Sequence, residues 1–113
     1  MKRVKENQAF LNAIATTTRE RDGRGLIRSA KPKQLDAVCE IIVNILHGVL
    51  PISDSVKKKA ERHKTVLRKL AKKCLRKLKR KKLFLKYFTI IKRLIVAALP
   101  VIGLTLSAIQ LAS

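Results

Sequence analysis

Fifteen lysine and arginine residues between positions 57 and 82 are the side chains of this sequence with the most obvious chemistry. Ammonium and guanidinium groups neutralise phosphate, so a segment rich in them and poor in acids is typical of a protein that binds a polyanion. The stretch 56–93 carries eighteen such groups against one acid, Glu61, and its net charge of +17 supplies most of the +20 of the 113-residue chain. The candidate DNA-binding residues are Lys57, Lys58, Lys59, Arg62, Lys64, Arg68, Lys69, Lys72, Lys73, Arg76, Lys77, Lys79, Arg80, Lys81 and Lys82.

A run of charges is more often only the solvated face of a helix, and that interpretation has to be weighed here. An ordinary solvated face mixes both signs of charge, whereas pairs such as Lys69 and Lys73 repel each other at a spacing of four residues. Each such pair costs a helix about 0.2–0.5 kcal/mol. Because no nearby acid compensates this cost, we favour a polyanion, and double-stranded DNA above all, as the partner. The pI of about 11.0 suits an anionic membrane surface equally well.

The apolar residues near the C-terminus suggest a second kind of chemistry, contact with lipid. Residues 83–99 form an amphipathic run, and the twenty residues from Leu94 to Ser113 carry no charge, which is about the length needed to cross a bilayer. We favour membrane contact for this tail; the alternatives are packing within a small soluble bundle and, for the aromatic rings, stacking on bases. The candidate membrane-contacting residues are Phe84, Phe88, Ile91, Leu94, Ile95, Leu99 and Ile102.

Catalysis is not expected from this sequence. The histidines and cysteines lack the paired spacing of zinc ligands, and the glycines near residue 24 do not form a phosphate-binding loop. We expect no cofactor and no metal. Cys39 and Cys74 each fall on an apolar helical face, so we expect two small buried side chains rather than a disulfide. The charged segment Met1–Glu6 argues against a signal peptide.

The elements that must position these side chains are predicted to be helices. Leucine, lysine, alanine and arginine dominate, and this composition predicts an all-α fold, either a small bundle or a hairpin with a long basic helix and an apolar C-terminal helix. The clearest helix begins at Pro32 and ends before Gly48, with apolar residues repeating every three or four positions between them. We expect this helix to be the hub of the core.

The remaining elements follow from the same periodicity. A short helix is predicted within residues 6–18, and the two glycines among the charges of residues 19–28 indicate a mobile connection, with room for a short helical turn at residues 26–30. Ser53, Asp54 or Ser55 can cap one long basic helix that runs to about Lys82. The chain is thus divided into a basic N-terminal segment (1–31), a helical hairpin (32–82) and a C-terminal tail (83–113).

Two features together resemble a known family. A basic segment with the cluster Leu67–Ala71 precedes the apolar run Leu94–Gly103 with Pro100 at its middle, and the stretch Gln34–Gly48 is followed by Pro51. This arrangement, which covers about residues 30–113, resembles the short basic core proteins of adeno-like viruses and of Polinton or Maverick elements, such as the adenovirus pX or mu precursor. The Gly-Gly cleavage site that such proteins carry ahead of the tail has no counterpart here.

The resemblance implies a protein that condenses the viral genome inside a capsid. The implied partner is double-stranded viral DNA, with self-association or capsid proteins as further partners and the virion core and host nucleus as locations. A small membrane-active or tail-anchored cationic protein, held to lipid through residues 94–113, is the alternative that the sequence leaves open.

Overall fold

In the part of the chain that the structure describes, every regular element is a helix. The structure is a computed structural model that describes the backbone of residues 2–72 and 77–112, and the side chains of residues 2–72 and 79–102. The predicted all-α fold is confirmed. The helices are α1 (Lys2–Glu6), α2 (Gln8–Thr16), α3 (Glu20–Arg28), α4 (Pro32–Leu46), α5 (Asp54–Arg62), α6 (Lys64–Ala71), α7 (Lys77–Lys86) and α8 (Phe88–Ala112).

Helix α4 has the limits that the sequence predicts. Pro32 occupies its first turn, and the backbone N–H of Lys31 donates to Oε1 of Gln34 at 2.8 Å, which satisfies one donor at the helix start. Past its end Gly48 has φ of +70°, a conformation that side chains with a Cβ rarely adopt. The helix contacts α1, α5, α6 and α8, so it lies at the centre of the fold as expected.

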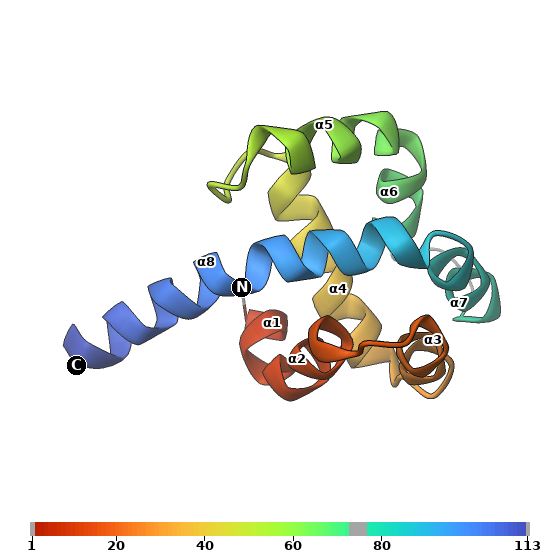
Figure 1. The fold of residues 1–113 in the computed structure, drawn as a ribbon, viewed down its shortest axis with the longest axis horizontal. Coiled ribbons are helices and arrows are strands. Elements are labelled where there is room, and N and C mark those ends of the chain that lie inside the picture. The colour runs from red at the N-terminus through yellow and green to blue at the C-terminus, as the bar shows by residue number, and fades with distance from the viewer. Residues whose placement is uncertain (1, 73–76, 113) are drawn as a thin grey trace.

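Helix α8 crosses in front of α4 and holds the other helices together (Figure 1). Helices α1, α2 and α3 lie on one side of α8, and α5 lies on the other. Helix α8 contacts α2, α4 and α5, while α7 leads into it and packs on α3. The described side chains of all three predicted segments, from Val4 to Ile102, contribute to one hydrophobic core.

The apolar face that the sequence offers to a membrane is covered by protein in this fold. Six of its seven residues have exposed fractions of 4% or less, and Leu99 is partly buried. A chain this small has few apolar residues to spare, so the face is used for the core instead. The residues that belong to the core are Phe84, Phe88, Ile91, Leu94, Ile95 and Ile102. Across the described residues, no helix is both long enough and apolar enough to span a membrane.

The long basic helix predicted for residues 54–82 is three helices in the structure. Helix α5 ends at Arg62, because the φ of −105° and ψ of 15° of the next residue, His63, leave the helical range. Helix α6 ends at Ala71, and Lys72 after it has an extended ψ of 126°. The three helices differ in their sets of partners: α5 packs on α4 and α8, α6 packs on α4, and α7 packs on α3. Ala60 of α5 and Leu67 and Leu70 of α6 are all buried in the core.

The predicted mobile connection at residues 19–28 is also wrong, because residues 20–28 form helix α3. Glu20 and Arg24 form an ion pair at 2.9 Å, at the four-residue spacing that supports a helix. Gly23 is buried against the ring of Phe88, so this glycine allows close approach of two helices instead of marking a loop.

Candidate nucleic-acid interface

The structure separates the fifteen predicted DNA-binding residues by exposure. Eight side chains are exposed, and within the described part of the chain none of the eight forms an ion pair. The exposed residues are Lys57, Lys58, Arg62, Arg68, Lys69, Lys72, Lys79 and Lys82. Lys59, Lys64 and Lys81 are partly buried, and Arg80 is buried. Lys73, Arg76 and the side chain of Lys77 lie outside the described residues.

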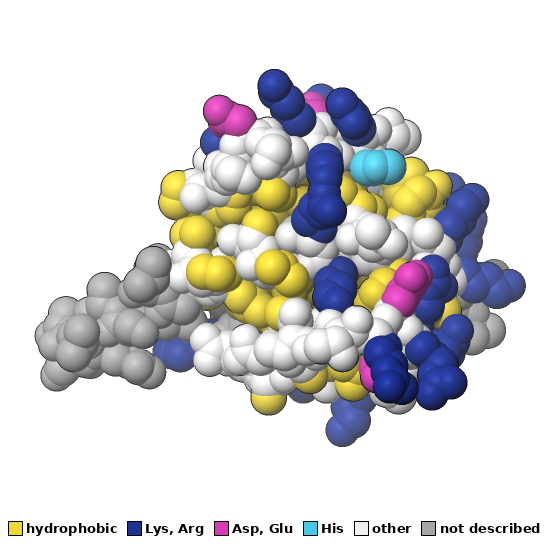
Figure 2. All heavy atoms as spheres, in the orientation of Figure 1, with side chains coloured by type: hydrophobic (Ala, Val, Ile, Leu, Met, Phe, Trp, Pro, Cys, Tyr) yellow, Lys and Arg dark blue, Asp and Glu magenta, His cyan; other side chains and the backbone are white. Residues whose placement is uncertain are grey.

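These cations do not form a single stripe. Helices α5 and α6 both pack on α4, whereas α7 packs on α3, and Figure 1 shows α5 and α7 at different parts of the molecule. Figure 2 shows lysine and arginine side chains over α5 and along the edge of the molecule where α3 and α7 lie. A surface of this kind can contact phosphates on more than one side of the protein.

Helix α3 adds cations that the sequence-based set omits. Arg21 and Arg28 are exposed on α3, and α3 packs directly on α7. The Nζ atom of Lys81 donates to the backbone carbonyl oxygen of Arg28 at 2.7 Å, so a cation of α7 stabilises the last turn of α3. The packing of α3 on α7 therefore places the basic N-terminal segment beside the basic α7, an arrangement that periodicity along the chain does not reveal.

Arg80 is not part of the interface, which corrects its assignment as a DNA-binding residue. Its Nη1 atom lies 2.7 Å from Oδ1 of Asp36, and its Nη2 atom donates to Sγ of Cys39 at 2.8 Å. The thiol of Cys39 in turn donates to the carbonyl oxygen of Leu70 at 3.3 Å. A guanidinium with an exposed fraction of 9% and two protein partners is not available to phosphate.

This buried cluster has defined protonation states. Burial raises the pKa of the Cys39 thiol, although the neighbouring guanidinium of Arg80 acts in the opposite direction. Burial also acts against the charge of Arg80, but its hydrogen bonds to Cys39 and Asp36 outweigh burial and raise the pKa of the guanidinium. Near neutral pH the cluster therefore holds a neutral thiol and a charged arginine. The contacts of Arg80 with Asp36 and Cys39 join α7 to α4, so this cluster stabilises the fold.

A basic recess lies where α5 approaches the junction of α7 and α8. Its volume is about 340 Å³, and we call it the Tyr87 recess. It is lined by Lys59, Arg62, His63, Lys86, Tyr87, Thr89, Ile90 and Arg93. Only Lys59 and Arg62 belong to the set predicted from sequence. The sequence offered no sign of this recess, because its residues come from two segments that meet only in the folded chain.

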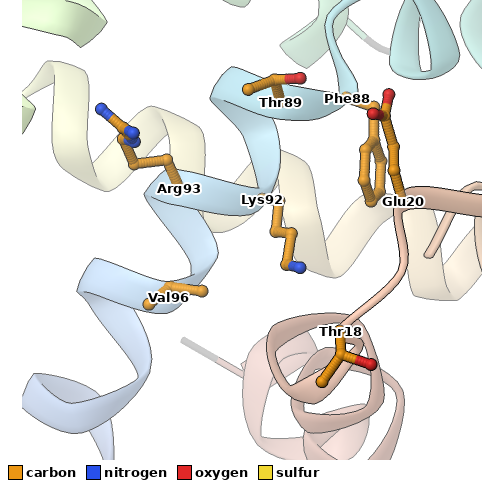
Figure 3. Close-up of a pocket in the computed structure, with 7 residues that line it drawn as sticks. All are labelled: Thr18, Glu20, Phe88, Thr89, Lys92, Arg93 and Val96. Atoms are coloured by element: carbon orange, nitrogen blue, oxygen red, sulfur yellow. The ribbon is translucent and has the colours of Figure 1, made fainter.

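A second recess, of about 380 Å³, lies on another side of α8 and has a different character (Figure 3). Lys92 extends from α8 toward the segment that holds Thr18, whereas Arg93 points away from it. The Nζ atom of Lys92 donates to the carbonyl oxygen of Thr17 at 2.6 Å, and the acidic Glu20 also lines this recess. Lys92 joins the end of α2 to α8, and Arg93, the other cation of its lining, points away from Thr18, so this recess is a weaker candidate for an anion.

Comparison with protein families, with curated proteins and with solved structures finds no match to this chain. Within the described residues, no group of three or more His, Cys, Asp or Glu side chains is arranged to hold a metal ion. The features of this protein that bear on its function are therefore the charge of its exposed side chains and the arrangement of the helices that carry them.

Proposed function

We propose that this protein binds and compacts double-stranded DNA without sequence preference, by neutralising phosphates with exposed lysine and arginine side chains. The observation that carries the proposal is the set of eight exposed cations, seven on α5, α6 and α7 and one at Lys72 just after α6, which form no ion pair within the described residues. Such contacts fix a protein on the duplex but carry no sequence information, because phosphates are the same at every base pair.

The spread of these cations supports compaction as well as binding. The exposed residues Lys57, Lys58 and Arg62 lie on α5, whereas Lys79 and Lys82 lie on α7. Helix α5 packs on α8, and α7 packs on α3 at another part of the molecule (Figure 1). One copy can thus hold phosphates of two duplexes at once, and bridging of this kind draws DNA segments together.

Salt dependence of duplex affinity tests the binding step. The logarithm of affinity should fall linearly with the logarithm of salt concentration, with a slope of about −0.9 per phosphate contacted. Random and unrelated duplexes of equal length should bind equally. Affinity that does not change with salt, or a strong preference for one sequence, would contradict the proposal.

Two charge-removal variants test the bridging step. One variant carries Lys57→Gln, Lys58→Gln and Arg62→Gln, and the other carries Lys79→Gln and Lys82→Gln. Each should still bind a single duplex, with a shallower salt slope, but each should condense long DNA less than the parent protein in light scattering. If both variants condense DNA as well as the parent, the two surfaces do not bridge.

The virion core and the host nucleus remain part of the proposal, and they rest on the resemblance to basic core proteins of adeno-like viruses. Fractionation of particles and of cells should find this chain with DNA. Co-fractionation with membranes, together with rupture of anionic liposomes by a protein that leaves DNA unprotected from nuclease, would favour the membrane-active alternative instead.

A further inference from the structure

The Tyr87 recess combines an aromatic ring with a ring of cations. Each fully ionised side chain that lines it is basic, two from α5 and two from the α7–α8 junction: Lys59, Arg62, Lys86 and Arg93. Arg62, Lys86 and Arg93 are exposed, and Lys59 is partly buried, so the charged groups can reach a ligand from solvent. The recess therefore suits an anion that also has a flat, unsaturated part.

The ring of Tyr87 lines this recess beside the ring of His63. Its centroid lies 6.3 Å from that of the His63 ring, with an angle of 59° between the two planes. The Nζ atom of Lys86 lies 5.7 Å from the Tyr87 centroid, over the ring. A cation at this distance is attracted by the face of an aromatic ring, so Lys86 covers one face of Tyr87, and a base that stacks on this face has to displace the ammonium group.

The size of the Tyr87 recess favours an unpaired nucleotide over a base-paired duplex. A volume of about 340 Å³ is at the small end of the range for ligand pockets and is enough for one nucleotide. In a duplex the bases are stacked on one another, so their faces are not available to an aromatic ring. An unpaired nucleotide, by contrast, can place its base on an aromatic ring and its phosphates on the surrounding cations.

We propose that the Tyr87 recess binds single-stranded nucleic acid, with one base stacked on Tyr87 and the adjoining phosphates held by Arg62 and Arg93. Lys86 then moves from the face of the ring to a phosphate. This inference rests on the proposed binding of nucleic acid and adds to it a specific site for an unpaired strand, such as a single-stranded end or gap in an otherwise duplex genome.

The composition of the chain makes a direct test available. Tyr87 is the only tyrosine and the protein has no tryptophan, so intrinsic tyrosine fluorescence comes from this recess alone. A short oligothymidylate should quench this emission in a saturable way, because stacking brings the base against the ring. A blunt duplex with the same number of phosphates should bind with little quenching. Binding of the oligothymidylate without quenching would overturn the proposal.

Matched variants separate stacking and local contact from total charge. Arg93→Gln lies in the recess and Lys82→Gln lies outside it, yet each removes one positive charge from an exposed position. Arg93→Gln should weaken oligothymidylate binding several times more than Lys82→Gln. Equal effects of these two variants would contradict the site.

A ring replacement adds the second comparison. Tyr87→Leu should weaken oligothymidylate binding by about fivefold or more, whereas Tyr87→Phe should restore it, since stacking needs the ring and not the hydroxyl. Circular dichroism and thermal unfolding check that each variant is folded. If Tyr87→Leu does not fold, the comparison of Arg93→Gln with Lys82→Gln tests the site instead. If these tests fail while the parent protein still binds duplex DNA, only the single-strand site in the recess is ruled out. If the parent protein shows no salt-dependent binding to duplex DNA, the proposed function itself is ruled out.

Discussion

The ring of Phe88 occupies the space where a Cβ atom on Gly23 would lie. A Cβ built on Gly23 would be 2.3 Å from Cζ of Phe88 and 3.1 Å from Oγ1 of Thr17. Phe88 is the first residue of α8 and is 2% exposed, so its ring cannot turn outward without opening the core. The absence of a side chain at position 23 therefore determines how closely α3 approaches α8.

Gly23→Ala should destabilise the protein by about 1–3 kcal/mol, because the new methyl group overpacks the core against Phe88. The free energy of unfolding from a urea titration measures this change. Gly25→Ala is the matched control, since nothing lies within 4 Å of a Cβ at that position. That substitution should stabilise α3 by about 0.5–1 kcal/mol, because alanine has the higher helix propensity. If both substitutions stabilise the protein, α3 does not pack on Phe88 in this way.

Arg80→Gln should affect stability and leave the duplex interface unchanged. It leaves Asp36 and Cys39 without their partner, which should cost about 1–3 kcal/mol. Lys82→Gln removes the same charge from an exposed position and should change stability by less than about 0.5 kcal/mol. If Lys82 contacts a phosphate, its loss makes the salt slope shallower by about 0.9, whereas Arg80→Gln leaves the slope as it was. If Arg80→Gln makes the salt slope shallower without any loss of stability, Arg80 contacts a phosphate and belongs to the duplex interface after all.

Stability should fall on the alkaline side because of Cys39. Burial raises the pKa of this thiol in the folded state above the ordinary value of about 8.5 in the unfolded chain. The contribution of the neutral thiol is complete below the unfolded pKa and is lost as pH rises through the folded pKa, by at most about 1.4 kcal/mol per pH unit.

Cys39→Ser isolates this effect, since a hydroxyl keeps the hydrogen-bonding capacity and does not titrate in this range. The comparison needs Cys74→Ser in both proteins, so that Cys39 is the only thiol that differs. Between about pH 8 and pH 10 the protein with Cys39 should lose more unfolding free energy than the serine variant. Deprotonation of the lysines acts on both proteins alike, so parallel curves would show that Cys39 is not buried as a neutral thiol.

Leu94→Ala should destabilise the protein by about 2–5 kcal/mol, the usual cost of truncating a buried leucine. Leu94 is fully buried, whereas Val96, two residues further along α8, is 45% exposed. Val96→Ala should therefore cost less than about 1 kcal/mol, since little apolar surface is lost and alanine favours the helix. Equal effects of the two substitutions in urea unfolding would mean that the start of the uncharged tail lies outside the core.

Local chemistry was enough to predict the helical class and the central helix from sequence. Pro32 at the first turn and Gly48 past the end act within a few residues of the helix termini that they define, so the limits of α4 could be predicted without knowing the fold. The same holds for the excess of positive charge in residues 56–93, because no fold can create neutralising acids that the sequence lacks.

The tertiary structure alone decided which of those charges and apolar faces are available. Arg80 resembles its basic neighbours in sequence, yet it is buried because Asp36 and Cys39 of α4 come to meet it. From sequence, Phe88 lies on a face for which membrane contact is favoured over a core or base stacking, and in the structure its ring is buried in the core against Gly23. Burial depends on which distant surface covers a residue, and periodicity along one helix does not contain that information.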